Sequence, residues 1–351
     1  MDRRGTMRDR VDMAQEGRPA TVPGAGRTAR ALWYVAAGEC ALNAVSLPEP
    51  GPEDCVVRTL WSGISRGTER LVFEGRVPPS EFERMRAPFQ EGDFPFPVKY
   101  GYCAVGIVEA GPARLLGRIV FCLHPHQDRF VAPADRLVPV PAEVPARRAV
   151  LAANMETALN AHWDAGSGPA DRIVVVGGGV LGLLVAWLAA RLPGAEVTLV
   201  DLDPARAAIA AWLGLGFALP GEAPREADIV FHASASAPGL ATAIAAAGQE
   251  GCIVEMSWYG EGAVAAPLGG AFHARRLQLV SSQVGAIAPS RRPRWDYARR
   301  SAAAMALLAE PLLDALITEE IAFDEAPARL PLLLAPGARG LTAAICYEAA
   351  P

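Results

Sequence analysis

The feature that most constrains the fold is an alternation of apolar strands and helices in the second half of the chain. The strand IVVV at 173–176 runs into GGGVLG at 177–182, and a second strand, EVTLVD, ends in an aspartate at 201. Later strands at 227–234 and 251–258 are separated by an alanine-rich helical stretch. Alternation of this kind predicts βαβ units and an α/β fold with a doubly wound parallel sheet.

The three glycines have the spacing of a dinucleotide-binding turn. Gly177, Gly179 and Gly182 match G-x-G-x-x-G, with Val180 and Leu181 in the variable positions that open the helix. Gly177 permits the tight turn, Gly179 lets the backbone approach a pyrophosphate, and Gly182 lets the helix pack closely on the strand. The helix N-terminus then offers free N–H groups and partial positive charge to the phosphates.

Asp201 is the acidic residue that this fingerprint requires about 20 residues further along. Its carboxylate would accept hydrogen bonds from the adenosine ribose and repel a 2′-phosphate. The pattern therefore predicts NAD(H) as the cofactor in preference to NADP(H), although Arg206 nearby would weaken that preference. The alternative is a glycine-rich turn in some other parallel sheet, which leaves the agreement of strand, turn, helix and acid unexplained.

Composition excludes several other classes of protein. The chain has 351 residues, of which 51% are hydrophobic, and a formal net charge of -5. This balance suits about two globular domains and argues against nucleic acid as a partner. No apolar run is both long enough and free enough of charge and proline to span a membrane. Six cysteines without a C-x-x-C pair predict a reduced, cytoplasmic protein.

The pattern divides the chain into four regions. Residues 1–27 lack the apolar core of a signal peptide, and we interpret them as a disordered lead. Residues 28–150 consist of short β-branched runs separated by glycine and proline, which predicts a β-rich domain. Residues 151–290 carry the alternating pattern of the dinucleotide-binding domain. Residues 291–351 form a mixed tail that we expect to return to the first domain.

This organisation resembles the medium-chain dehydrogenase/reductase superfamily over about residues 30–351. The motifs that carry the resemblance are SGISRGTE at 62–69, GYCAVGIVEAG at 101–111, LVDLDPARAA at 199–208 and GCIVEMSWYG at 251–260. The resemblance is strongest toward the zinc-binding alcohol dehydrogenase-like branch. It implies a GroES-like β-rich catalytic domain beside a Rossmann domain, a small-molecule substrate, and a homo-oligomer that is a dimer or a tetramer.

The chain departs from the zinc-dependent members of that superfamily at the positions where they bind the metal. The resemblance places a cysteine, a histidine and a third ligand where this chain has Ser65, Tyr102 and Ala153. The four-cysteine structural zinc lobe is missing as well. Zinc needs three or four nitrogen, sulfur or oxygen donors that converge on it, and these side chains do not supply them. We therefore expect no metal ligands and no catalytic zinc.

A substitute zinc site is the alternative, built from Glu69, Cys103, His124 and His126. On a strand the two histidines would share a face, and both imidazoles would reach one ion. Pro125 between them predicts a turn or a strand edge instead.

Reduction of a carbonyl places negative charge on its oxygen, so a site without metal needs a side chain that donates a proton. Tyr102 takes a former ligand position, and we expect its phenol to be this acid. Lys99, the one lysine in the chain, would lower the pKa of Tyr102, and Ser65 would orient the substrate. Glu156 is the rival acid. The alternatives are structural: a solvated charge for Lys99, a core aromatic for Tyr102, and a helix-surface charge or a salt bridge to Arg66 for Glu156.

Four further hydroxyls are assigned to the site. Ser257 and Ser282 follow later strands at the carboxyl edge of the parallel sheet, where we expect them to contact the nicotinamide. Thr157 matches a helical threonine of the superfamily and is assigned to the coenzyme. Thr68 is either a relay near the nicotinamide ribose or a turn cap. The arginine-rich segment at 290–300 is either a site for an anionic substrate or a solvated helix start, and we favour the second.

Taken together, the sequence predicts an NAD(H)-dependent oxidoreductase that interconverts a secondary alcohol and a carbonyl on a small organic substrate. Two alternatives remain open. One is an enoyl or quinone reductase of the same superfamily, in which hydride goes to a conjugated carbon. The other is a non-catalytic NAD(H)-binding redox sensor.

Overall fold

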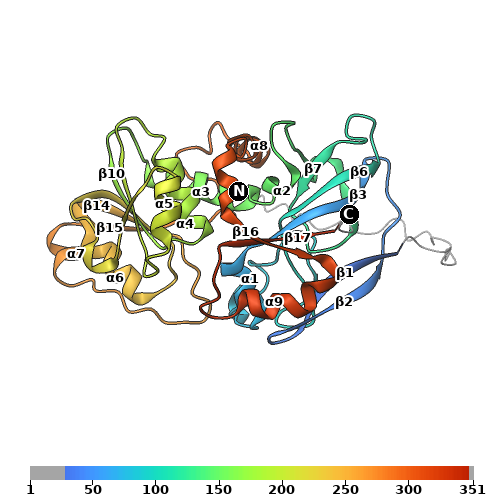
Figure 1. Ribbon diagram of the computed structural model, residues 1–351, viewed down its shortest axis with the longest axis horizontal. Helices are drawn as coiled ribbons and strands as arrows, with labels where there is room; N and C mark the ends of the chain where they lie inside the picture. Colours follow the sequence, from blue (N-terminus) through green and yellow to red (C-terminus); the bar gives the residue numbers. More distant parts are fainter. Residues whose placement is uncertain (1–27, 348–351) are drawn as a thin grey trace, which may run out of the picture.

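The structure is a computed structural model that describes residues 28–347. The predicted lead at 1–27 lies outside these residues. Figure 1 shows a parallel sheet with its helices on one side of the molecule and a β-rich part on the other. Within the described range, no helix has both the length and the apolar character needed to cross a membrane.

A six-stranded parallel sheet forms the Rossmann part of the described chain. Its order, β12-β11-β10-β13-β14-β15, is the doubly wound order 3-2-1-4-5-6. Every neighbouring pair of strands is parallel, which confirms the predicted α/β fold class. The strands are β10 (Arg172–Val176), β11 (Glu196–Val200), β12 (Gly216–Ala218), β13 (Ala227–His232), β14 (Ala247–Glu255) and β15 (Gln278–Ser281).

Helices cover both faces of this sheet because its strands are apolar on both faces. The central helix α4 (Val180–Ala189) is apolar all round, since α3 (Ala152–Ala165) packs on it from outside while β10 and β11 lie beneath it. Its Trp187 is among the most deeply buried large side chains. The other helices of this part are α5 (Arg206–Trp212), α6 (Ala237–Ala246) and α7 (Ala271–Ala274).

Two sheets build the β-rich part. The smaller has the order β2-β1-β5-β4, and the larger has the order β16-β17-β3-β6-β7-β9, with β8 paired to β3. The smaller sheet contains β1 (Thr28–Ala36), β2 (Glu39–Ser46), β4 (Glu91–Gly92) and β5 (Val98–Lys99). The larger contains β3 (Asp54–Ile64), β6 (Ala104–Ala110), β7 (Ile119–Cys122), β8 (Arg129–Pro133), β9 (Val138–Pro139), β16 (Ile317–Ala322) and β17 (Thr342–Cys346).

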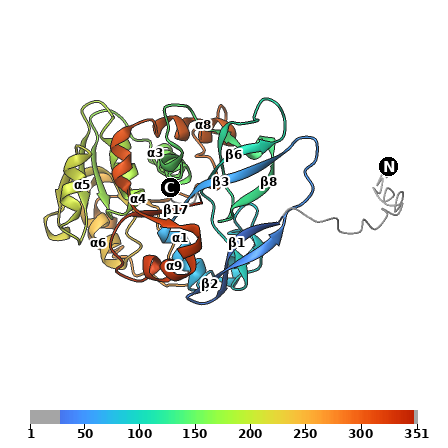
Figure 2. The same ribbon diagram turned by 45° about the vertical axis from the view of Figure 1, so that its right-hand side comes forward.

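The last part of the chain joins both halves. Strand β17 pairs with β3 in an antiparallel register in which Ala343 faces Ile64, and Figure 2 shows these two strands beside each other. Strand β16 extends the sheet beyond β17. Helix α8 (Tyr297–Leu307) packs on α3, while α9 (Ala326–Leu334) packs on α1 (Arg66–Phe73) and β2. Helix α2 (Ala146–Ala149) lies against β3 and β6. The two large hydrophobic clusters meet at Tyr102, whose ring packs against both.

Candidate active site

The glycine turn between β10 and α4 has the geometry that its spacing predicts. Gly177 has φ +113°, and a Cβ there would lie 2.8 Å from the backbone N of Ser234. A Cβ on Gly182 would lie 1.9 Å from the carbonyl oxygen of Gly177, so only hydrogen fits between helix and strand. A Cβ on Gly179 would meet no atom within 4 Å. Gly179 therefore borders open space, as expected of a backbone that a ligand approaches.

The first turn of α4 faces that open space. Gly179 is the N-cap residue and is exposed, and no side chain caps the helix. Val180 and Leu181 follow it and are half-buried, so their N–H groups belong to the free N-terminal end of the helix. A helix end of this kind favours phosphate groups.

Asp201 lies beside the same turn. Its Oδ2 accepts a hydrogen bond from the Gly178 N–H at 2.6 Å, and its Oδ1 accepts one from the Asp203 N–H at 2.8 Å. A carboxylate has about four acceptor positions, so two remain for ribose hydroxyls. The turn, the helix end and this acid together fit a dinucleotide.

An arginine cluster that sequence reasoning did not assign adjoins the turn. Arg66 and Arg206 both donate to the carbonyl oxygen of Gly340 at 3.0 Å, and Arg70 donates to the carbonyls of Leu334 and Ala335. Burial lowers the pKa of Arg66, and the like charges of Arg70 and Arg206 lower it further. Positive charge held against backbone carbonyls suits a phosphate ligand. The signal in the sequence was the arginine that directly follows Ser65.

Tyr102 lies beside the hydroxyls predicted to work with it. The side chains of Ser65 and Thr68 lie near enough to its phenol to lower the pKa as hydrogen-bonding groups. Burial raises the pKa of the phenol above its ordinary value, and the nearby Cys103 and Glu69 raise it further, while Ser65 and Thr68 oppose the shift. The phenol is therefore protonated at neutral pH and can donate.

The predicted partnership of Lys99 with Tyr102 is not formed, and this is a correction. Lys99 is 2% exposed, and its Nζ lies 2.5 Å from Glu91 Oε1 and 2.7 Å from Gln127 Oε1. Burial lowers its pKa. Strand β5 pairs with β4 in the smaller sheet, which directs this side chain to Glu91, while the turn at Gly101 takes Tyr102 elsewhere. The solvated alternative is equally wrong.

Glu156 is not placed to act as an acid, which corrects the second assignment. Its carboxylate is buried and accepts hydrogen bonds from Arg300 Nε at 2.7 Å and from Ser301 Oγ at 3.0 Å. An ionised carboxylate held by a guanidinium is an acceptor only. The alternative of a salt bridge to Arg66 was wrong about the partner, because Glu156 forms its salt bridge with Arg300 and Arg66 donates to backbone carbonyls.

Ser282 and Thr157 use their hydroxyls within the protein. Ser282 Oγ donates to Asp164 Oδ2 at 2.7 Å, in the same network as Glu156, because Asn160 contacts both Asp164 and Arg300. Thr157 Oγ1 donates to the carbonyl of Ala153 at 2.9 Å, a local helical bond. Neither hydroxyl donates a hydrogen bond to the glycine turn.

Ser257 belongs to a polar cluster at the carboxyl edge of the parallel sheet. His232 ends β13 and Glu255 ends β14, and their Nδ1 and Oε2 atoms lie 2.7 Å apart. Ser257 N–H and the Tyr259 hydroxyl both donate to Glu255. Burial raises the pKa of Glu255, but His232 and Ser257 outweigh it and leave that pKa below its ordinary value. Sequence reasoning missed His232 and Glu255, although both are the last residues of adjacent strands.

The residues of the substitute zinc site are divided between two environments. Glu69 Oε2 and His126 Nε2 lie 2.9 Å apart, in direct contact. The imidazole of His124 instead stacks on Phe130 with ring centroids 4.0 Å apart, and its Nδ1 contacts the Pro125 carbonyl. Among residues 28–347, no three His, Cys, Asp or Glu side chains are grouped to hold a metal ion.

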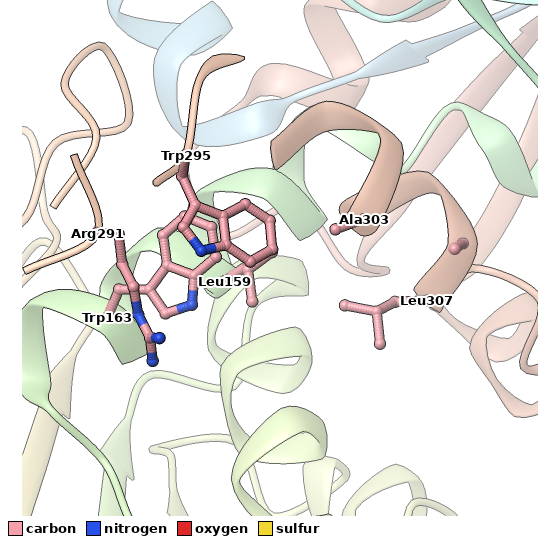
Figure 3. A pocket seen from close by; sticks show the side chains of 7 residues that line it. Leu159, Trp163, Arg291, Trp295, Ala303 and Leu307 are labelled. Carbon is pink, nitrogen blue, oxygen red and sulfur yellow. The ribbon is translucent and has the colours of Figure 1, made fainter. Parts of the chain in front are cut away.

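The arginine-rich segment borders a groove of about 510 Å³ between α3 and α8 (Figure 3). The indoles of Trp163 and Trp295 lie with ring centroids 4.7 Å apart, and Arg291 lies over Trp163. Asp296 caps α8 by accepting from the Arg299 N–H at 2.7 Å, as expected of a helix start. None of the residues assigned to the site lines this groove.

Comparison with known proteins gives partial matches in sequence. No protein-family profile matches the chain. Two curated proteins, both named 2-desacetyl-2-hydroxyethyl bacteriochlorophyllide A dehydrogenase, match part of it. The protein from Cereibacter sphaeroides is 34% identical over 170 residues, which cover 43% of this chain and 49% of that protein. The protein from Rhodobacter capsulatus is 29% identical over 210 residues, 55% of this chain and 62% of that protein. The matches thus span about half to three-fifths of these relatives.

Solved structures match over nearly the whole chain. L-idonate 5-dehydrogenase from Escherichia coli K-12 has a TM-score of 0.75 at 15% identity and covers 92% of this chain and 99% of its own. The 2R,3R-butanediol dehydrogenase of Bacillus subtilis has a TM-score of 0.74 at 16% identity, with coverages of 91% and 100%. Benzyl alcohol dehydrogenase from Acinetobacter calcoaceticus has a TM-score of 0.73 at 16% identity, with coverages of 92% and 100%. The chain therefore has the fold of the medium-chain dehydrogenase/reductase superfamily, a GroES-like part beside a Rossmann part, which its motifs resemble.

Proposed function

We propose that this chain is a nicotinamide-dinucleotide-dependent oxidoreductase that interconverts a secondary alcohol and a ketone on a small organic substrate. The observation that carries the proposal is the turn at 177–182, which is closed to any side chain at Gly182 and open at Gly179. A turn used only for packing would have no reason to leave the second position free.

The residues that would hold the dinucleotide come from both parts of the molecule. The α4 N-terminus and the arginine cluster would bind the phosphates, and Asp201 would bind the adenosine ribose. Arg66 and Arg206 meet at Gly340, so the α1 end of the β-rich part lies next to the Asp201 end of the parallel sheet. We propose that NAD(H) is preferred, because Asp201 repels a 2′-phosphate.

The chemistry that this chain supplies is proton transfer. A bound nicotinamide would provide the hydride in reduction and accept it in oxidation. When a ketone is reduced, its oxygen gains negative charge, and the Tyr102 phenol would donate its proton to that oxygen. The Ser65 and Thr68 hydroxyls would hold the phenol in place and stabilise the phenolate until solvent returns the proton. We propose that this acid serves in place of a catalytic zinc.

The substrate class is suggested by the curated relatives. Their name describes dehydrogenases that act on a hydroxyethyl-bearing bacteriochlorophyllide. Oxidation of an alcohol carbon is the reverse of the ketone reduction proposed above. We therefore propose an alcohol carbon bearing two carbon substituents as the reacting group of this chain's substrate.

The test is the oxidation of NADH by purified full-length protein against a panel of ketones and enones, with Tyr102→Phe as the variant. We expect ketone reduction, a fall in kcat of at least about 100-fold in Tyr102→Phe, and an unchanged Kd for NADH. Turnover of enones alone would favour the enoyl-reductase alternative. Tight NADH binding with no turnover on any carbonyl would favour the redox sensor. Equal kcat in the wild type and in Tyr102→Phe would remove the phenol from the mechanism.

A further inference from the structure

A buried carboxylate–imidazole pair connects the two chain segments that carry Tyr102 and its hydroxyl partners. Glu69 lies on α1, and His126 lies in the turn between β7 and β8; both are 0% exposed. Glu69 Oε2 and His126 Nε2 are 2.9 Å apart. The proposed reaction does not use either residue directly.

The carboxylate fixes the backbone at the start of α1. Glu69 Oε1 accepts a hydrogen bond from the Ser65 N–H at 2.6 Å, and Oε2 accepts one from the Tyr34 hydroxyl at 2.8 Å in addition to its contact with His126. A buried carboxylate without donors is costly, so these three donors determine where Glu69 lies. Through the first of them, Glu69 determines where Ser65 lies.

The imidazole fixes the backbone that presents Tyr102. His126 Nδ1 lies 2.7 Å from Ser62 Oγ, so both ring nitrogens have partners. The ring lies directly against Gly101, where a Cβ would be 2.8 Å from His126 Cδ2. Gly101 has φ +115°, a conformation that favours glycine, and Tyr102 follows it in the chain.

We infer that Glu69 and His126 are positioning residues, which hold the Tyr102 phenol and the Ser65 hydroxyl in register for proton transfer. This inference rests on the proposed function, in which Tyr102 is the proton donor. Glu69 fixes the backbone at Ser65 through the Ser65 N–H, and His126 packs against Gly101, the residue before Tyr102. The pair thus joins the two segments at which the zinc-dependent relatives are expected to place their first two ligands.

A positioning role and a merely structural role predict different kinetics. If the pair only stabilises the fold, its loss lowers the unfolding temperature and acts independently of the Tyr102 hydroxyl. If it positions the phenol, its loss lowers kcat only while that hydroxyl is present. Residues that act through one another show such non-additivity in a double-mutant cycle.

The experiment is a cycle of Glu69→Gln, Tyr102→Phe and the double variant in the full chain. Glutamine keeps the size of the side chain and an oxygen that can accept from Ser65. NADH oxidation with the most reactive ketone gives kcat, NADH fluorescence gives Kd, and thermal unfolding gives stability. We expect Glu69→Gln to lower kcat about tenfold in the wild-type background and less than about twofold in Tyr102→Phe, with the Kd for NADH unchanged.

His124→Gln is the matched control. His124 lies two residues away and is also buried, but it stacks on Phe130 and does not contact Glu69. We expect kcat of folded His124→Gln to stay within about twofold of wild type, as for most changes outside the site. If Glu69→Gln does not fold, Ser62→Ala replaces it in the cycle, because it removes the other partner of His126.

The outcomes separate the two levels of the argument. Equal fold losses from Glu69→Gln in both backgrounds, while Tyr102→Phe lowers kcat, would overturn the positioning role and leave the proposed function standing. No loss of kcat in Tyr102→Phe would overturn both. A loss of kcat in His124→Gln as large as that in Glu69→Gln would also overturn the positioning role, because any buried change nearby would then have the same effect.

Discussion

Substitution of two glycines in one turn should separate folding from binding. At Gly179, φ is −74° and ψ is 176°, which is extended backbone that alanine adopts freely. A Cβ there meets no atom within 4 Å. Gly179→Ala should therefore change the free energy of unfolding by no more than about 0.5 kcal/mol, or raise it slightly by restricting the unfolded chain.

The same methyl group should weaken dinucleotide binding. A phosphate oxygen must come within about 2.9 Å of a backbone N–H to form a hydrogen bond, and a Cβ on Gly179 occupies that approach. We expect Kd for NADH to rise about 10- to 100-fold in Gly179→Ala, equivalent to about 1.4–2.8 kcal/mol. Gly182→Ala should behave in the opposite way. Its Cβ would lie 1.9 Å from a carbonyl oxygen. The helix must then shift by about 1 Å, at a cost of about 3 kcal/mol or more.

Urea unfolding and NADH fluorescence titration measure the two quantities on the same samples. Gly168→Ala is the matched control, because a Cβ there has only one neighbour, Asp171 Oδ2 at 3.9 Å, and the residue precedes β10. It should keep wild-type affinity and stability. If Gly179→Ala binds NADH as tightly as wild type, the open space at this turn is not where the dinucleotide lies, and the reasoning fails.

Four more substitutions, which make three predictions, test other parts of the structure. Burial lowers the pKa of His124 to about 3. Below about pH 6.5 the unfolded chain therefore binds a proton there that the folded chain does not, and the free energy of unfolding should fall by about 1.4 kcal/mol per pH unit toward pH 3. In urea unfolding, His124→Gln should lose less stability than the wild type between pH 7 and pH 4.5, and an equal loss would contradict this prediction. Arg300→Met should lower the free energy of unfolding by about 3 kcal/mol, because it leaves the buried Glu156 carboxylate without its guanidinium partner. It should leave kcat per folded molecule unchanged, and a large fall in kcat would restore Glu156 as the acid. Asp201→Asn should raise the affinity for NADPH relative to that for NADH, and Arg206→Ala added to Asp201→Asn should reverse that gain. If the ratio of the two Kd values is the same in the wild type, the single variant and the double variant, Asp201 does not select the cofactor.

The dinucleotide turn could be predicted because all of its determinants lie close together in the sequence. Gly177 to Gly182 and Asp201 belong to one βαβ unit, in which local rules for turns and helix starts fix the geometry. The structure has the turn geometry that this spacing predicts and adds the carboxylate bond to Gly178, while dinucleotide binding at the turn stays a prediction. Tyr102 and Ser65 were assigned together only through the resemblance, and in the structure the Ser65 side chain lies near enough to the Tyr102 phenol to lower its pKa. Their catalytic roles stay predictions.

The errors concern side chains whose partners lie far away in the sequence. Glu156 is 144 residues from Arg300, and Lys99 finds Gln127 on a separate loop. The periodicity of a sequence does not predict which buried charges pair with each other, because long-range ion pairs depend on how sheets and helices pack. The sequence grouped Glu69 and His126 only as candidate ligands of a substitute zinc site. Their direct contact with each other depends on the fold, which places α1 beside the turn that carries His126.

The position of β17 has a consequence for how the molecule is made. Ala343 pairs with Ile64 in the middle of the larger sheet, whereas the strands of the parallel sheet all lie between Arg172 and Ser281. During synthesis the parallel sheet can form as soon as its own strands have emerged, but one edge of strand β3 stays unpaired until β17 (Thr342–Cys346) has been made. Unpaired edges of this kind invite association between nascent chains. Expression at reduced temperature, which slows association between growing chains, should therefore increase the yield of folded protein relative to aggregates.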